Sequence, residues 1–227
     1  MEYILELYQK PYDFKRPMVC FDEKSFQLLA HITNSLGLKP GRASRQDYTC
    51  AARQCRCEYK RNGTRNLFIF VEPKAGSRHV LVTHHRTKQD FAFAMRYLVD
   101  VIYPEAECID VVMDNLNTHH YHSLVEFFGK QEADRITLAP HASAGVARLE
   151  FHYTPEHASW LNMAEIELSI LSTQCLSRRI PNEWMLITEI VTWEVARNEK
   201  KAKIRWNFTV DEARKVFKDH YPTSLTC

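Results

Sequence analysis

The sequence of 227 residues lacks the features that mark membrane, secreted and repeat proteins. No apolar run approaches the roughly 20 residues that span a bilayer, and no secretory signal opens the chain. Neither an internal repeat nor a low-complexity segment is present, so solenoid architectures are excluded as well. The formal net charge of +2 is small, so any binding of a charged partner has to follow from where the charges lie rather than from their total.

The cysteines do not describe a disulfide framework. Seven is an odd number, and without a secretory signal we expect a reducing, cytoplasmic environment. Cys50, Cys55 and Cys57 lie close together, but neither they nor the histidines near positions 84, 119 and 122 have a complete four-ligand zinc spacing. Three unconnected thiols are the favoured interpretation, and a zinc site completed by a distant histidine is the alternative.

The first half of the chain is predicted to form a sheet. With 45% hydrophobic and 26% charged residues, the chain is long enough for one core and too short for two large domains. Runs of strand-forming residues bounded by turns predict an antiparallel front sheet from residues 17–29, 67–72 and 79–83. A helix over 90–103, with Asp90 as its candidate cap, then leads to a buried strand that stops at Asp114.

The second half is predicted to be mainly helical. A helix over 122–130 and a polar, alanine-rich stretch precede a strand over 149–153, and helices over 159–177 and 182–200 follow. Ser159 is a candidate N-cap for the first of these two helices. Strands, then a helical crossover to a buried strand, then more helices, indicate an α/β fold with a mixed sheet flanked by helices.

Three acids on three separate elements suggest a metal cluster. The apolar runs before Asp22 and Asp114 each stop at the acid, and Glu165 lies on a predicted helix. An acid at the end of a buried strand loses hydration and needs a compensating partner. Two magnesium ions about 3.5–4 Å apart would supply it and would clamp a phosphodiester for in-line displacement. Taken singly, Asp22 is explained as well by pairing with Lys24, and Asp114 by starting a turn.

Longer motifs around these acids favour the metal-binding interpretation over the ordinary structural roles. The sequences at 111–119 (VVMDNLNTH) and 155–165 (PEHASWLNMAE) resemble the DDE transposases of bacterial insertion sequences, in the branch related to mariner elements. The resemblance extends to 20–24 (CFDEK) and to 206–209 (WNFT), so that it spans nearly the whole chain. Three motifs in the same order are far more specific than any one of them.

The resemblance implies a ribonuclease H-like fold and a DNA-cleaving and strand-transferring enzyme. It assigns Asp22, Asp114 and Glu165 as the catalytic residues that bind two Mg²⁺ ions, with Mn²⁺ as a substitute. The same carboxylates would serve hydrolysis at the transposon end and attack of the freed 3′-hydroxyl on target DNA, without a covalent enzyme intermediate. It divides the chain into a lead-in segment (1–16), the catalytic domain (17–205, with a basic insertion around 39–65) and a C-terminal tail (206–227).

Helical periodicity does not choose between Glu165 and Glu167, because both flank the same predicted apolar stripe. The family places its glutamate three residues after the asparagine of the Trp-Leu-Asn motif, which selects Glu165. Glu167 is then expected to face solvent.

Four neighbouring residues have both a functional and a structural interpretation. Asn115, His119 and Asn162 would orient ligands or substrate, whereas turn and capping roles explain the two asparagines at least as well. Trp160 would stack on a base or wedge at the DNA end, but a core position is favoured for a tryptophan at the first turn of an amphipathic helix.

Charge is concentrated in two places. Residues 39–65 contain only two acids and eight basic residues that are candidates for phosphate contact: Lys39, Arg42, Arg45, Arg53, Arg56, Lys60, Arg61 and Arg65. A solvated loop is an equally good explanation. A second cluster, Lys200, Lys201, Lys203 and Arg205, lies near the end of a predicted helix, where the helix dipole explains it without DNA.

The expected partner is double-stranded DNA, as transposon ends and as target, with association at the nucleoid and no membrane contact. The chain begins about twenty residues before its first catalytic acid, so we expect a separate helix-turn-helix polypeptide to recognise the inverted repeats, and a homodimer is a further expected partner. Two alternatives to a transposase domain stay open: a non-integrating metal-dependent nuclease of the same fold, and an inactive DNA-binding remnant.

Overall fold

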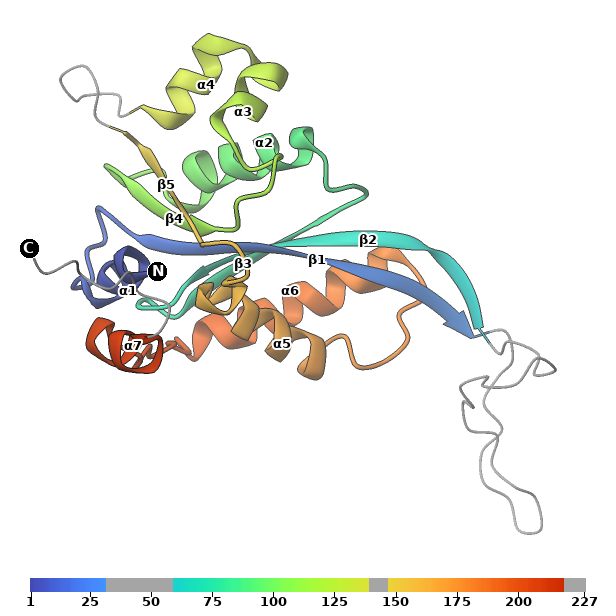
Figure 1. Cartoon of the computed structure of the whole chain (residues 1–227). Helices are drawn as coiled ribbons and strands as arrows, with labels where there is room; N and C mark the ends of the chain where they lie inside the picture. The colour runs from blue at the N-terminus through green and yellow to red at the C-terminus, as the bar shows by residue number, and fades with distance from the viewer. Residues whose placement is uncertain (32–58, 139–146, 219–227) are drawn as a thin grey trace, which may run out of the picture.

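A central five-stranded sheet organises the protein (Figure 1). The structure is a computed structural model, and it describes residues 1–31, 59–138 and 147–218. The strands lie in the order β3-β2-β1-β4-β5. β1, β2 and β3 pair antiparallel, whereas β4 pairs parallel with both β1 and β5. Their bounds are β1 Met18–His31, β2 Tyr59–Glu72, β3 Ser77–Thr83, β4 Ile109–Met113 and β5 Leu149–Tyr153.

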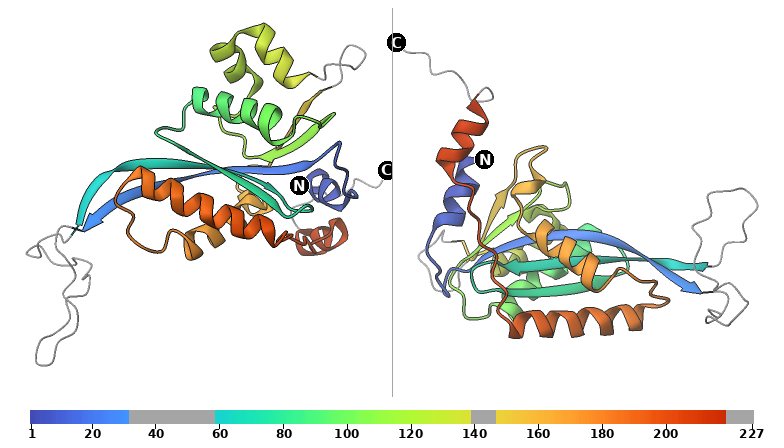
Figure 2. Two further views of the ribbon diagram at one scale, coloured as in Figure 1. Left: turned by 180° about the vertical axis from the view of Figure 1, so that it is seen from behind. Right: turned by 90° about the horizontal axis from the view of Figure 1, so that it is seen from below.

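Helices cover both faces of this sheet (Figures 1 and 2). One face carries α2 Lys88–Tyr97, the π-helical turn η1 Leu98–Ile102, α3 Tyr121–Phe128 and α4 Lys130–Thr137. The other face carries α5 Ala164–Gln174 and α6 Glu183–Glu199, with α1 Glu2–Gln9 and α7 Val210–Val216 side by side at one end. The mixed α/β sheet flanked by helices is therefore confirmed, including its antiparallel front half.

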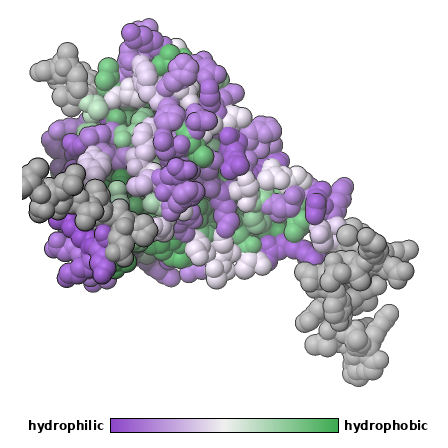
Figure 3. Space-filling model, in the orientation of Figure 1, coloured by the Kyte–Doolittle hydropathy of each residue, from purple (hydrophilic) through white to green (hydrophobic). Residues whose placement is uncertain are grey.

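The alternation of side chains along the strands creates two cores. On β1, Val19 and Phe21 point to the core under α2 and α3, and Cys20 points to the core under α5 and α6. All five residues of β4 are buried, as expected for a central parallel strand covered on both faces. Hydrophilic side chains predominate over α3, α4 and α7 on the face seen in Figure 3. No helix among the described residues is both long and apolar enough to cross a bilayer.

Several predicted boundaries are correct and others are wrong for identifiable reasons. β5 has the predicted bounds. α2 starts earlier than predicted, because Thr87 is its N-cap and Asp90 completes a capping box three residues later. α4 was not predicted, because its sequence is polar apart from Ala133 and Ile136, which are buried. Ser159 does not cap α5: a short 3₁₀ turn, η2 Ser159–Leu161, precedes that helix.

The turn between β2 and β3 brings the backbone close to the segment that follows α6. Gly76 has φ +75°, and a Cβ there would lie 2.5 Å from the carbonyl carbon of Lys201. Gly129 has a similar φ of +80° but nothing within 4 Å of the equivalent Cβ position. Substituting each glycine by alanine therefore distinguishes the free-energy cost of a positive φ, present at both positions, from the cost of a clash between the new Cβ and Lys201, present only at Gly76.

We expect Gly129→Ala to lower the free energy of unfolding by about 1 kcal/mol, the cost of the left-handed backbone. Gly76→Ala should lower it by about 1–3 kcal/mol more, because rigid backbone atoms must move. Urea unfolding of the two variants measures the difference. Equal losses would show that the contact with Lys201 contributes nothing.

Candidate active site

The sheet brings Asp22, within β1, close to Asp114, which directly follows β4. β1 and β4 run parallel with Cys20 opposite Val112, and each acid follows its partner by two residues. Because side chains alternate along a strand, Asp22 shares a face with Cys20, which belongs to the core under α5. The Asp22 carboxylate thus lies on the face that α5 covers, and Asp114 directly follows the end of the neighbouring strand.

Glu165 lies in the first turn of α5, which Asn162 attaches to β1. The Asn162 side-chain amide donates to the carbonyl oxygen of Phe21 at 2.8 Å, and its oxygen accepts from the amide of Ala164 at 3.1 Å. Asn162 is 2% exposed, so these hydrogen bonds are sheltered from water. The start of the helix that carries Glu165 is therefore tied to the residue immediately before Asp22.

The three acids interact electrostatically. Burial raises the pKa of Asp22 to about 7, and the charges of Glu165, Asp114 and Glu23 add to this, against a hydrogen bond from the Glu23 amide. The pairing of Asp22 with Lys24 that the sequence allowed is not what the structure has, because Lys24 donates to the Ser172 hydroxyl at 2.6 Å. Asp22 is thus a partly buried carboxyl group near the carboxylates of Glu165, Asp114 and Glu23.

His119 is the charged neighbour of this group. Its Nδ1 lies 2.6 Å from an Asp114 carboxylate oxygen and its Nε2 lies 3.5 Å from one of Glu23. Burial lowers the pKa of His119, but the hydrogen bonds and charges of the two acids outweigh it and raise the pKa to about 9. The ring is 1% exposed and lies against Phe91. His119 therefore fixes the orientation of Asp114 from the opposite face of β1.

A surface hollow of about 370 Å³ adjoins Glu165. Glu23 and Lys24 of β1 and Ser169 and Ser172 of α5 also line it. Glu165 itself is exposed. A substrate can therefore reach this carboxylate directly from solvent.

Glu167 does not face solvent, and that expectation is wrong. It is 0% exposed, and its Oε1 accepts from Arg78 at 3.1 Å and from Arg197 at 2.6 Å. Arg78 is itself fully buried and also donates to the carbonyl oxygens of Gly76 and Ala202. Glu167 is therefore committed to two arginines, and its burial turns the exposed Glu165 outward on the same helix.

The other predicted site residues are distributed more widely. Asn115 is exposed. Trp160, for which a core position was favoured, is 43% exposed and stacks on Trp206 with ring centres 6.3 Å apart. Lys60 and Arg61 are exposed on the projecting end of β2, whereas Arg65 binds Glu183 at 3.0 Å. The remaining candidates lie outside the described residues: Lys39, Arg42, Arg45, Arg53 and Arg56, and the cysteines Cys50, Cys55 and Cys57.

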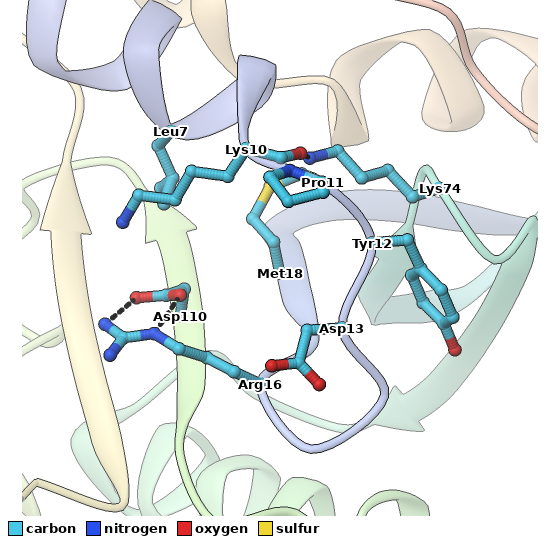
Figure 4. A pocket seen from close by; sticks show the side chains of 9 residues that line it. All are labelled: Leu7, Lys10, Pro11, Tyr12, Asp13, Arg16, Met18, Lys74 and Asp110. Atoms are coloured by element: carbon cyan, nitrogen blue, oxygen red, sulfur yellow. Dashed lines mark hydrogen bonds and ion pairs between the residues drawn. The ribbon is translucent and has the colours of Figure 1, made fainter.

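A second polar cluster, which sequence reasoning missed, lies at the other end of the parallel strands. Asp110, Glu150 and His152 have ligand-type atoms within 4.8 Å of one another, and they are the one such group among the residues described. Arg16 already occupies it, with Nε 2.8 Å from Asp110 and Nη2 2.6 Å from Glu150. Figure 4 shows this guanidinium on Asp110 beside a small hollow.

This second cluster is neutralised internally. His152 is 2.7 Å from Asp110 on its other side, so each acid has a hydrogen-bond donor. Among the described residues, Asp22, Asp114 and Glu165 do not have their ligand-type atoms all within 4.8 Å of one another, as this group does. Internal ion pairs therefore account for the charges of the Asp110 cluster. They do not account for the charges of Asp22 and Glu165.

The sequence from 17 to 187 matches the family described as DDE superfamily endonuclease. The chain belongs to this family. The match includes Asp22, Asp114 and Glu165, so the DDE domain encloses the site built above. No curated protein matches the chain.

Solved structures support the same fold for this DDE domain. The Mos1 mariner paired end complex with Mn has a TM-score of 0.53 at 13% identity, over 88% of this chain and 54% of that one. The Mos1 strand transfer complex gives 0.54 at 12%, over 88% and 53%. The Mos1 paired-end complex with left transposon end gives 0.52 at 15%, over 88% and 55%. The ribonuclease H-like fold is confirmed, and the chain spans about half the length of these proteins.

We expect Glu167→Gln to lower the free energy of unfolding by about 3–5 kcal/mol, because it leaves two arginines without their buried counter-charge. Glu165→Gln, two residues away and exposed, should change it by less than about 0.5 kcal/mol. Urea or thermal unfolding of both variants tests this. A stable Glu167→Gln protein would contradict the structural role assigned to Glu167.

The Arg16 cluster predicts acid sensitivity. Burial raises the pKa of Asp110, but hydrogen bonds from Arg16 and His152 outweigh it and hold that pKa well below its usual value of 3.8. A depressed carboxyl stabilises the fold above its unfolded pKa and loses that contribution as the pH falls. Asp110→Asn should cost roughly 2 kcal/mol at pH 7 and should flatten the fall in unfolding free energy below about pH 4. An unchanged pH profile would contradict it.

Proposed function

We propose that this DDE domain is the catalytic half of a transposase that cleaves DNA at transposon ends and joins the freed 3′ ends to target DNA. One observation carries the proposal: the parallel register of β1 and β4 sets Asp22 beside Asp114, while Asn162 ties the helix of Glu165 to the same strand. Acids from three elements are thus close enough to interact electrostatically, and Glu165 borders an open surface hollow.

The chemistry of these side chains fits a divalent metal. All three donors are carboxylates, the hard oxygen ligands that Mg²⁺ and Mn²⁺ prefer. The raised pKa of Asp22 reflects burial beside other negative charges, a situation that a cation relieves. We infer that Asp22, Asp114 and Glu165 hold two Mg²⁺ ions, with Mn²⁺ as a substitute. Such ions, when bound, activate the attacking oxygen and stabilise the leaving oxygen of an in-line displacement.

The protein's own residues position the reacting groups. His119 holds the Asp114 carboxylate at 2.6 Å, and Asn162 holds the start of α5 against β1. Because both supports are buried, the acids are organised before DNA arrives, which lowers the cost of reaching the productive geometry. The hollow beside Glu165 then receives the phosphodiester.

Double-stranded DNA is the proposed substrate, in the cytoplasm and at the nucleoid. The Mos1 structures are complexes at transposon ends. In this chain, Lys60 and Arg61 are exposed on the projecting β1–β2 hairpin. We propose that a separate helix-turn-helix region recognises the ends and that two copies of the domain act together.

A non-integrating nuclease of the same fold is the second candidate, because the same three acids suffice for hydrolysis alone. Strand-transfer products from a pre-cut transposon end, in a magnesium-dependent reaction with target plasmid, distinguish the two. Nicking without joining would favour the nuclease, and binding without either would favour an inactive remnant.

We expect Asp22→Asn, Asp114→Asn and Glu165→Gln each to lower the cleavage rate by at least about 10³-fold, because an amide is a poor ligand for a hard cation. DNA affinity should change little. Glu156→Gln is the matched control, since Glu156 is 89% exposed in the same segment as Glu165, and it should keep normal activity.

The metal can be followed without turnover. Mg²⁺ or Mn²⁺ at a hundred times its dissociation constant should stabilise the wild-type protein by about 2.7 kcal/mol, and Asp114→Asn should lose this. Cleavage by Asp114→Asn at the wild-type rate, or equal stabilisation of both proteins, would overturn the assignment.

A further inference from the structure

The segment between α6 and α7 presents a row of basic side chains on one side only. Over residues 202–208 the chain forms neither helix nor strand, and exposure alternates from Lys201 onward. Lys201, Lys203 and Arg205 are exposed, whereas Ile204 and Trp206 turn towards the core under α5. Figure 2 shows this segment running from the end of α6 past α1 to α7.

Hydrogen bonds and ring contacts hold this segment in place. The carbonyl oxygen of Ala202 accepts from buried Arg78 at 2.6 Å, and the amide of Ile204 donates to the carbonyl oxygen of Pro73 at 3.0 Å. The Trp206 ring lies 5.4 Å from that of Tyr8 and 6.3 Å from that of Trp160. The exposed cations therefore project from a fixed backbone, which reduces the entropy lost when they bind a partner.

The same segment borders a surface hollow of about 360 Å³. Eight residues line it, of which Lys74, Lys203 and Arg205 are basic and none is acidic. Met163, the N-cap residue of α5, lines it too. A hollow with three cations and no acid thus opens beside the start of the helix that carries Glu165.

Two of these cations, Lys203 and Arg205, have no partner among the described residues. Among the described residues, neither Lys203 nor Arg205 has a side-chain hydrogen bond or an ion pair, in contrast to Arg16 and Arg135, which bind carboxylates. The helix dipole does not account for them either. α6 ends at Glu199, and the dipole effect is confined to the last turn, so Lys203 and Arg205 lie beyond its reach.

The partly buried position of Lys74 favours binding of an anion in the hollow. It lies in the β2–β3 turn and donates to the carbonyl oxygen of Lys10, as Figure 4 shows. Burial lowers the pKa of Lys74, and the Lys10 charge lowers it further. A phosphate in the hollow would offset both effects, because an opposite charge favours the protonated amine.

We propose that Lys74, Lys203 and Arg205 form a phosphate track that seats the backbone of double-stranded DNA beside the N-terminus of α5. Duplex DNA carries one negative charge per about 1.7 Å of its axis, so neighbouring phosphates can meet cations spaced along the segment between α6 and α7. The track contacts the backbone and therefore adds affinity without sequence preference. This inference rests on the proposed function, because it assigns the substrate contacts of the same site.

The test is the salt dependence of DNA binding by the full chain with the double substitution Lys203→Gln and Arg205→Gln. Duplex DNA of random sequence is titrated without divalent metal, so that catalysis does not enter. Loss of two phosphate contacts should reduce the slope of log affinity against log salt by about 1.8 and weaken binding at least roughly tenfold at about 0.1 M salt.

Two controls separate charge from structure. Lys88→Gln with Lys130→Gln makes the same change in net charge on the α2 and α4 side of the sheet and should leave the slope unchanged. Lys203→Arg with Arg205→Lys keeps both charges and should bind normally. If the double glutamine variant does not fold, Lys203→Gln alone should still reduce the slope by about 0.9.

The outcomes distinguish this inference from the proposed function. One outcome is that the wild-type protein binds and cleaves DNA while the double glutamine variant keeps the wild-type salt slope. That result would overturn the phosphate track and leave the proposed function intact. The cations would then serve another polyanion, such as an acidic protein surface. If the wild-type protein does not bind DNA at all, both the track and the proposed function fail.

Discussion

The buried ion network around Arg78 holds together α5 and the segment after α6, the two features on which the proposed function depends. The Arg78 guanidinium donates to Glu167 of α5 and to the carbonyl oxygen of Ala202. Arg197 of α6 donates a second hydrogen bond to Glu167. Removing two arginines and a glutamate from water costs several kcal/mol per ion unless each is paired, so the network has one arrangement. That arrangement fixes the rotation of α5, and hence the outward direction of Glu165. It also fixes the path of the segment that presents Lys203 and Arg205.

The two ends of the parallel strands handle negative charge in opposite ways. At the start of β4, Asp110 has Arg16 on one side and His152 on the other, so the fold supplies the counter-charge. At the end of β4, Asp114 faces Asp22 and Glu165, and His119 supplies one cation for several acids. The carboxyl ends of parallel strands are where ligands of open α/β sheets bind. Burial beside other negative charges raises the pKa of Asp22 at this edge, and a bound cation would relieve this charge imbalance as the proposed metal-dependent function requires.

Local patterns in the sequence were sufficient to locate the strands. The apolar run before Asp114 does mark the end of β4, whereas β1 continues past Asp22 to His31, so the run before Asp22 marks only the buried part of that strand. Local patterns were insufficient wherever a distant partner decided the outcome. Glu167 finds its arginines 89 and 30 residues away, so no helical pattern could reveal its burial. The hydrogen bond from Asn162 to Phe21 spans 141 residues, and it interrupts what reads as one continuous helix. The assignment of Glu165 from the motif resemblance stays a prediction, and the structure adds that Glu165 is exposed whereas Glu167 is buried.

The distribution of cations without an internal counter-charge also favours one face of the protein for the proposed binding of DNA. On the side of α2 to α4, Arg135 binds Asp100 and Glu132, and Lys88 binds Glu126, so these cations are already satisfied. On the side of α5, Lys203 and Arg205 flank the hollow next to Met163, and Trp206, which also lines that hollow, stacks on Trp160 of η2. A polyanion gains most where cations have no internal counter-charge to give up. The proposed phosphate track therefore favours an approach of duplex DNA along the α5 face, where the hollow is lined by Trp206, which stacks on Trp160.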